Sequence, residues 1–242
     1  MGKPYATELN RLSETYAWAL KVPIEPITAA VSASATLSLL AVGSGGSFTA
    51  AHLACALHQR HSGMVSRPFT PLEFVSSSLY LGNLGAMILS AGGTNKDVVA
   101  VLKNAALREP RRCIVLCLRR ASSLSRLAKS YRYMDLVDLN PPSVKDGFLA
   151  TNSLLAFSVL LARAYIGVFS LYPALPERLE DLTATFLKNF LNKCKPLCQR
   201  ETLVVLHGST GHSAALDLES KFSEAALGNV LLSDFRNFAH GR

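Results

Sequence analysis

The chain has 242 residues, of which 49% are hydrophobic, and it carries a formal net charge of +8 at pH 7. This apolar content supplies a sizeable core and excludes an intrinsically disordered chain. The positive charge would suit a polyanion, but the basic residues are scattered and lack the interleaved aromatic side chains on which single-stranded nucleic acids stack. We therefore expect a folded protein with a solvated basic face and no nucleic-acid partner.

The first 36 residues predict two helices. Apolar residues recur with helical spacing over Tyr5–Lys21. Pro23 and Pro26 interrupt this pattern, and a second helix is expected over Ile27–Ala35.

The stretch Leu37–Leu57 joins a strand, a glycine-rich loop and an alanine-rich helix. The strand is expected at Leu37–Val42, and the loop that follows it contains Ser44, Gly45 and Ser47. The backbone N–H groups and the dipole at a helix start form an anion site, and glycine allows close approach of a ligand. The loop therefore predicts a phosphate site, to which the two serine hydroxyls add donors. A tight turn that binds nothing is the alternative.

A second loop of the same kind follows another strand. After the polar segment His58–Pro71, a short strand is predicted at Leu72–Val75 and a further strand at Ala86–Leu89. The latter runs into Ser90-Ala91-Gly92-Gly93-Thr94-Asn95, after which Asp97–Leu107 has its apolar residues on one helical face.

Strands and helices continue to alternate up to residue 172. We expect strands at Cys113–Leu118 and Leu136–Leu139, a short helix at Ser122–Tyr131 and a long helix at Gly147–Tyr172. Apolar strands that alternate with helices predict a three-layer α-β-α unit around a five-stranded parallel sheet. Ligands bind such sheets at the carboxyl ends of the strands, where both loops are expected, and this favours phosphate binding over two structural turns.

The C-terminal part repeats the opening pattern. An amphipathic connector, Pro176–Asn192, and a basic loop, Lys193–Arg200, precede a strand at Thr202–Leu206. A glycine/serine turn, His207–Ser213, then leads into a helix from Ala214 to about Leu227. The expected domains are N-terminal helices (1–36), a first domain (37–172), a connector (173–200) and the beginning of a second, similar unit (201–242).

Cysteines and the longest apolar run bear on the location of the protein. Cys55, Cys113 and Cys117 lie in apolar runs, as small core residues do. The total of five is odd, and no signal peptide is recognisable, so we expect a cytoplasmic setting. Phe148–Ala162 is uncharged, but Arg163 interrupts the run before it reaches the roughly 20 residues that a membrane span needs. We expect a buried helix and no membrane.

Two groups of residues have side chains that can bind a metal. Cys194 and Cys198 could share a helical turn, but no Cys/His pair with finger-like spacing accompanies them. The spacing of His52, His58 and His61 is loose for zinc. We expect neither a metal nor a cofactor.

The order of these motifs resembles the sugar isomerase (SIS) domain family, from Leu37 to the C-terminus. The first loop is close to the form found in phosphoheptose isomerases. The second resembles the family's Ser-x-Ser-Gly-x-Thr, followed by x-Asp: Ser90, Gly93 and Asp97 match, whereas Gly92 and Asn95 replace the second serine and the threonine. The resemblance implies a sugar-phosphate site that lacks two hydroxyls, formed by Ser44, Gly45, Ser47, Ser90, Thr94 and Asn95.

The C-terminal residues are similar to the isomerase half of glucosamine-6-phosphate synthases. A helix of that enzyme family is matched by Ala215–Asp217, Lys221 and Glu224. Its His-Gly is matched by His240-Gly241, and the separation between Glu224 and His240 is the same as in that family. The resemblance implies that Glu224 moves the proton between C1 and C2 and that His240 assists ring opening. A carboxylate in a buried site suits such a proton transfer. A surface glutamate in exposed helical pairs is the alternative.

The sequence thus predicts an α/β double-SIS protein that binds a phosphorylated sugar. It would catalyse aldose–ketose isomerisation or a related enediol reaction such as deglycation, which Glu224 and His240 favour. The alternative is a non-catalytic SIS-fold sensor of a sugar phosphate or nucleotide sugar, which the altered second loop favours. We also expect a homodimer or higher oligomer, because Gly147–Tyr172 has more apolar surface than one sheet face needs and the resembled family shares sites across subunits.

Overall fold

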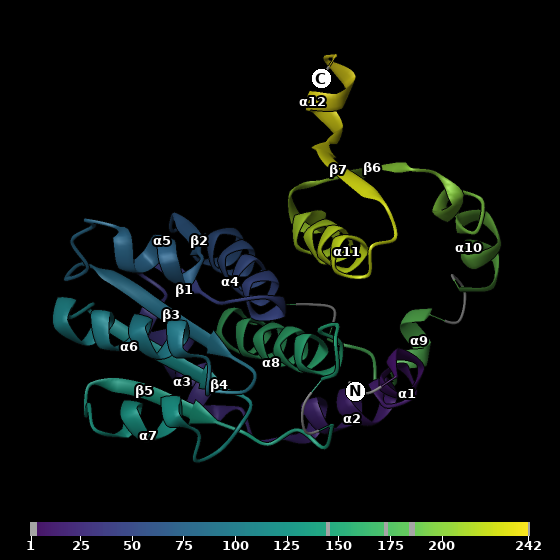
Figure 1. The fold of residues 1–242 in the computed structure, drawn as a ribbon. Coiled ribbons are helices and arrows are strands. Elements are labelled where there is room, and N and C mark those ends of the chain that lie inside the picture. Colours follow the sequence, from purple (N-terminus) through teal and green to yellow (C-terminus); the bar gives the residue numbers. More distant parts are fainter. Residues whose placement is uncertain (1–3, 144–145, 172–173, 184–186, 242) are drawn as a thin grey trace. The chain divides into compact units, whose positions relative to one another are not determined.

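The computed structural model describes residues 4–143, 146–171, 174–183 and 187–241. The chain divides into two compact units, residues 1–175 and 176–242 (Figure 1). The narrower domain bounds expected from the sequence, 37–172 and 201–242, remain predictions.

The first unit is built on a five-stranded sheet in which every neighbouring pair of strands is parallel. In spatial order the strands are β2 (Ser66–Phe69), β1 (Ser38–Val42), β3 (Leu84–Ser90), β4 (Arg112–Cys117) and β5 (Met134–Asp138). This confirms the predicted α/β fold with a five-stranded parallel sheet.

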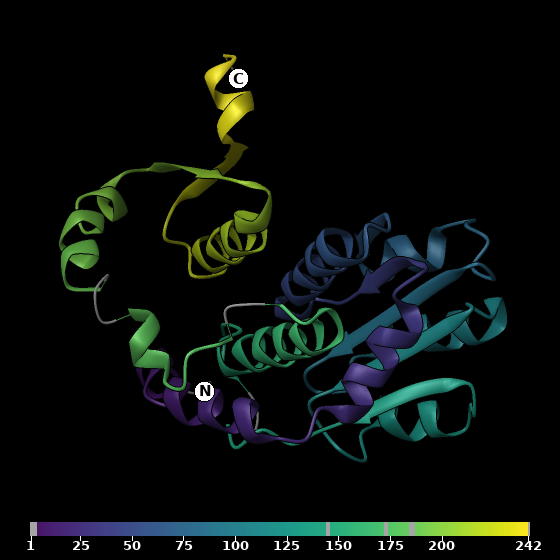
Figure 2. The same ribbon diagram turned by 180° about the vertical axis from the view of Figure 1, so that it is seen from behind.

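Helices cover both faces of this sheet. One face carries α3 (Glu25–Ser34), α4 (Gly46–Ser62) and α8 (Asn152–Phe169); Figure 2 shows α3 crossing the sheet beside α8. The other carries α5 (Pro71–Ser76), α6 (Lys96–Arg108) and α7 (Ser123–Lys129). Successive strand residues point to opposite faces, so Leu39 and Ala41 join the first core whereas Leu40 and Val42 join the second. Strands buried on both faces explain the continuous apolar runs in the sequence.

The N-terminal residues form three helices that belong to the first unit. α1 (Tyr5–Leu9) and α2 (Leu12–Lys21) are separate, because the chain leaves the helix at Asn10 and Arg11. α2 and α3 both pack against α8 and bury Tyr16 and Ile27 almost completely.

The long apolar helix predicted at Gly147–Tyr172 is α8, which begins only at Asn152. The predicted end at Tyr172 and the helix break at Pro173 lie outside the described residues. By length and composition α8 could cross a membrane, and 44% of it is buried inside the protein. Its apolar side packs on α2, α3 and α4, so much of the surface that suggested self-association is covered within the chain. Self-association itself remains a prediction.

The prediction of a strand at Leu72–Val75 is wrong, because this segment is helix α5. Thr70 and Glu73 form a reciprocal capping box: Glu73 N donates to Thr70 Oγ1 (3.2 Å) and Thr70 N to the Glu73 carboxylate (2.9 Å), and Pro71 occupies the first turn. The fifth strand is β2, within the segment His58–Pro71 that the sequence indicates to be polar. β2 lies at the sheet edge, where Pro68 is tolerated because no neighbouring strand needs its N–H.

The described residues of the second unit contain one strand–helix–strand motif. β6 (Thr202–His207) and β7 (Asn229–Asp234) form a parallel pair, and α11 (His212–Glu224) packs against both. The unit also holds α9 (Leu179–Thr183), α10 (Leu187–Cys194) and α12 (Phe235–Ala239). The sequence missed β7, which follows a turn with positive φ at Ala226 (52°) and Gly228 (145°). Phe186 of the predicted amphipathic connector lies outside the described residues.

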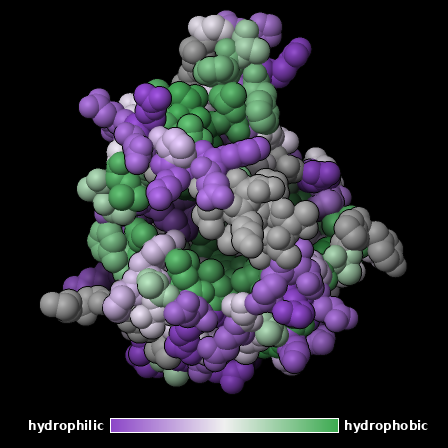
Figure 3. Space-filling view, turned by 90° about the vertical axis from the view of Figure 1, so that its right-hand side faces the viewer, coloured by the Kyte–Doolittle hydropathy of each residue, from purple (hydrophilic) through white to green (hydrophobic). Residues whose placement is uncertain are grey.

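This second unit has little core of its own. Ala215 is its one buried apolar side chain among those that the structure describes. Val204, Leu231 and Phe235 of this unit are exposed. On the face of the protein drawn in Figure 3, hydrophobic residues lie at the surface among hydrophilic ones.

Candidate functional site

The first glycine-rich loop joins β1 to α4 in a tight, uncapped turn. Gly45 is the residue before the helix, with φ 55°, and no side chain caps the first turn. A Cβ placed on Gly43 would lie 2.1 Å from the carbonyl oxygen of Ser47, so only glycine fits there. Ser47 N and Phe48 N donate to the backbone carbonyls of Ser44 (3.2 Å) and Gly45 (2.8 Å), but no side chain caps the start of α4, so its N-terminus remains suited to an anion. Ser47 is nearly buried in this first turn, whereas Ser44 is half-exposed.

The second loop, between β3 and α6, is capped instead. The Asn95 side-chain oxygen accepts hydrogen bonds from the backbone N–H groups of Asp97 (2.8 Å) and Val98 (3.3 Å). Ser90 Oγ accepts from Gly93 N (3.0 Å), which closes the loop and leaves the serine proton to donate elsewhere. Thr94 and Asn95 are exposed. The asparagine that stands in place of the expected threonine thus serves as the helix cap.

The two loops leave neighbouring strands at the same edge of the sheet. Val42 of β1 is paired with Ile88 of β3. Ser44 and Ser90 each stand two residues beyond this pair, and paired strands lie about 4.8 Å apart. The structure therefore places the loops that carry the six predicted binding residues next to each other, at the carboxyl ends of the strands.

Residues after β4 brace the second loop. Leu124 N donates to Gly93 O (2.9 Å), and Ser122 caps α7. A Cβ on Gly93 would lie 2.1 Å from Ser122 Oγ and 2.6 Å from Cys117 Sγ. Ser122 and Cys117 were not predicted as part of the site.

A third segment, just before α8, packs on the first loop. A Cβ on Gly46 would lie 2.1 Å from the Cβ of Ala150. Two carboxylates hold this segment: Asp146 accepts from the backbone N–H groups of Thr151, Asn152 and Ser153, and the buried Glu8 accepts from the Thr151 hydroxyl (2.9 Å). Sequence reasoning missed these residues, although a run of small polar residues before an apolar helix signals a helix start.

His58 lies in the core beneath β1 and is not available to a metal. Its Nε2 is 2.9 Å from the carbonyl oxygen of Leu37, which can only accept, so Nε2 carries the proton. Nδ1 therefore accepts from the Tyr165 hydroxyl at 2.9 Å. Burial is the main cause that lowers the pKa of His58 below its usual value.

Glu224 and His240 both lie in the second unit. Glu224 is the last residue of α11; its side chain is exposed and accepts a hydrogen bond from Ser220 Oγ (2.5 Å). His240 follows α12 and is exposed. Lys221 pairs with Asp217 rather than with Glu224. The buried site that would suit Glu224 as a base is thus not formed within its own unit, and the catalytic roles of the two residues remain predictions.

Comparison with solved structures identifies the fold. The C-terminal domain of glucosamine-fructose-6-phosphate aminotransferase from Francisella tularensis matches with a TM-score of 0.72 and 14% identity, over 98% of this chain and 71% of that one. Tagatose-6-phosphate ketose/aldose isomerase from Escherichia coli matches with a TM-score of 0.72 and 16% identity, over 100% and 71%. Glucosamine-6-phosphate deaminase from Thermotoga maritima matches with a TM-score of 0.69 and 15% identity, over 98% and 71%. No family model and no curated protein sequence matches the chain.

The protein is therefore an α/β protein with the fold of phosphosugar-isomerase structures. The resemblance to the SIS family inferred from the two loops is confirmed at the level of the fold.

Proposed function

We propose that the first unit binds the phosphate group of a phosphorylated sugar between its two glycine-rich loops. The observation that carries this proposal is the pairing of β1 with β3, because both strands end at one sheet edge in loops that open helices. Parallel α/β sheets bind ligands at this edge. Solved structures with the same fold include a tagatose-6-phosphate ketose/aldose isomerase, which supports a sugar phosphate as the ligand class.

Each loop has a distinct part in binding. The uncapped start of α4, around Gly45, offers backbone N–H groups, and Ser44 and Ser47 offer hydroxyl donors. Ser90 donates the proton that it does not use in closing its own loop. Thr94 and the amide nitrogen of Asn95 supply donors in place of the hydroxyls that the second loop lacks.

The proposed chemistry is aldose–ketose isomerisation or a related enediol reaction, such as deglycation. Glu224 would remove the proton from the carbon beside the carbonyl, which leaves an enediolate. It would return that proton to the former carbonyl carbon while a proton passes from the neighbouring hydroxyl to the enediolate oxygen, which forms the new carbonyl. His240 would protonate the ring oxygen while the anomeric hydroxyl loses its proton, so that the bond between the anomeric carbon and the ring oxygen breaks and the sugar ring opens. The ring-opening and proton-transfer steps need no metal or cofactor, and a homodimer or higher oligomer in the cytoplasm is part of the proposal.

A non-catalytic sensor of sugar phosphates or nucleotide sugars is the second candidate. Two observations favour it: Asn95 occupies the start of α6 with its own side chain, and Glu224 is exposed within its unit. Both candidates share the binding step and differ only in turnover.

Calorimetric titration with fructose 6-phosphate, tagatose 6-phosphate and sedoheptulose 7-phosphate tests the binding step. Ser47→Ala and Ser90→Ala should each weaken binding about 10- to 100-fold, the range for hydrogen bonds to a charged group. Ser32→Ala, at an exposed position of α3, is the matched control and should change nothing. If all three variants bound the sugar phosphates with equal affinity, the proposed phosphate site would be wrong.

Turnover separates the two candidates. General acid–base groups contribute about 10²–10⁴-fold in rate, so Glu224→Gln should remove most isomerisation and leave binding nearly intact. A protein that binds one of these sugar phosphates with the same affinity before and after the substitution, yet turns over none, is the sensor.

A further inference from the structure

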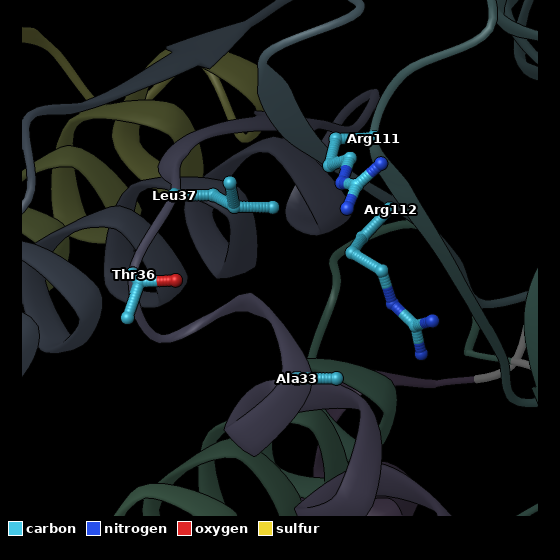
Figure 4. A pocket seen from close by; sticks show the side chains of 5 residues that line it. All are labelled: Ala33, Thr36, Leu37, Arg111 and Arg112. Carbon is cyan, nitrogen blue, oxygen red and sulfur yellow. The ribbon is translucent and has the colours of Figure 1, made fainter.

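A cavity lies at the edge of the sheet opposite the two loops. Its volume is about 470 Å³, and it is lined by Ala33, Thr36, Leu37, Arg111 and Arg112 (Figure 4). Leu37 precedes β1, and Arg112 is the first residue of β4. Parallel strands all begin at the same edge, so this cavity is at the amino edge and separate from the proposed phosphate site.

Arginines form one side of the cavity. Figure 4 shows Arg111 and Arg112 facing Thr36, Leu37 and Ala33 across it. No acidic residue is among the described residues that line the cavity, and Asp135 pairs with Arg112 beside it. The cavity therefore has a cationic side and, opposite it, a hydroxyl and two apolar side chains.

The charges of the two arginines are only partly balanced by the protein. Arg112 Nη2 donates to Asp135 Oδ2 at 2.8 Å, but Arg112 Nε is buried and has no hydrogen-bond partner among the described residues. No partner for the Arg111 side chain is found in the described part of the chain either. That buried nitrogen is closed to the cavity, so an anion there would contact the accessible parts of the two guanidinium groups: Arg111 is exposed, and the Arg112 side chain is 36% exposed. Together the two positively charged guanidinium groups place hydrogen-bond donors at a cavity that has room for a ligand.

We infer that this cavity is a second anion site, which takes the phosphate group of a small phosphorylated molecule. Planar guanidinium groups match the geometry of phosphate oxygens and bind them with two parallel hydrogen bonds. The Thr36 hydroxyl can donate a further bond from the opposite side. Small-molecule sites usually have volumes of about 300–1,000 Å³, so the cavity has room for more than the phosphate group. A ligand here would bind without competing for the carboxyl-edge loops.

Arginine side-chain NMR tests this site separately from the first one. The protein is labelled with ¹⁵N, and inorganic phosphate, pyrophosphate or malonate is added at constant ionic strength while the Nε–Hε signals are followed. The Arg112 signal is assigned by its loss in Arg112→Lys. We expect a saturable shift of the Arg111 and Arg112 signals with phosphate and pyrophosphate, and a weaker response to the dicarboxylate malonate. Unshifted signals, or stronger binding of malonate, would overturn the inference.

A charge-matched pair of variants excludes a general effect of surface charge. Arg111→Gln should weaken phosphate binding at the Arg112 signal about 10- to 100-fold, as expected for lost hydrogen bonds to a charged group. Arg60→Gln removes the same charge from an exposed position of α4 and should leave the affinity unchanged. Equal weakening by both variants would overturn the site. Ser90→Ala should not affect it, so failure at one sheet edge is distinguishable from failure at the other.

Discussion

The two glycine-rich loops have the same position relative to the sheet but begin their helices differently. α4 begins after Gly45, without a capping side chain, whereas α6 begins after Asn95, whose side-chain oxygen occupies two backbone N–H groups. A helix start that is satisfied by its own cap is stable without a ligand, and an uncapped one gains most from an anion. The difference indicates that the first loop supplies most of the backbone binding and the second mainly side-chain donors.

Among substitutions in the two loops, those of glycine should have the largest effect on stability and on sugar-phosphate binding. Gly93→Ala would bring a Cβ against Ser122 and Cys117 at a residue with φ 62°. The conformation costs about 1–2 kcal/mol and the overpacking about 1–3 kcal/mol. Urea denaturation should show both losses, and sugar-phosphate binding should be abolished.

Gly63→Ala is the matched control for this loss. Gly63 has φ 75°, but nothing lies within 4 Å of its Cβ position. It should show the conformational loss of about 1–2 kcal/mol alone and keep binding intact. If the two variants lost equal stability, the close contact of the second loop with α7 would be wrong.

Restoring the hydroxyl that the second loop lacks should strengthen binding. A Cβ at Gly92 meets only Thr94 Oγ1, at 3.7 Å, which is an ordinary contact, and the residue has no positive φ. Gly92→Ser should therefore fold normally and tighten binding of a sugar phosphate by about tenfold, the value of one hydrogen bond to a charged group. Calorimetry measures this gain. An unchanged affinity at unchanged stability would mean that position 92 does not face the phosphate.

The cap of α6 can be separated from its part in binding. Asn95→Ala should cost about 1 kcal/mol of stability, as for other lost caps. Asn95→Asp keeps a capping oxygen and should keep the stability, but it removes the amide donors and repels phosphate, so binding should weaken. Denaturation and calorimetry on both variants check this. Intact binding in Asn95→Asp would show that the second loop does not contact the anion.

How much of this site was predictable depends on the distance between the partners along the chain. Both loops follow from local patterns, since glycine and serine directly follow apolar strands. The brace formed by Glu8 and Thr151 could not be predicted, because the two residues are 143 positions apart and neither stands in a recognisable motif. The strand prediction at Leu72–Val75 was wrong because it relied on the short apolar run and overlooked the capping box formed by Thr70 and Glu73, which indicates a helix start.

Acid should weaken the strand that carries the first loop. His58 holds Leu37, just before β1, and its pKa is lowered in the folded protein. The unfolded chain therefore takes up a proton near the usual pKa of about 6.5, before the folded protein does. The contribution of His58 to the free energy of unfolding should be fully present above this pH. It should fall as the pH drops from there toward the lowered pKa. Denaturation between about pH 5 and 8 measures this, and His58→Gln should flatten the dependence. An unchanged slope in that variant would assign the effect to another group.

The central claim, that both loops bind one phosphate, is tested most directly by backbone amide NMR with fructose 6-phosphate. The signals of Gly45 to Ser47 and of Gly92 to Thr94 are followed during the titration, with unphosphorylated fructose as the control. We predict that both sets shift with a single dissociation constant, that the first loop shifts further, and that fructose moves neither. Signals that stay in place, that saturate at different concentrations, or that respond equally to fructose would contradict the claim.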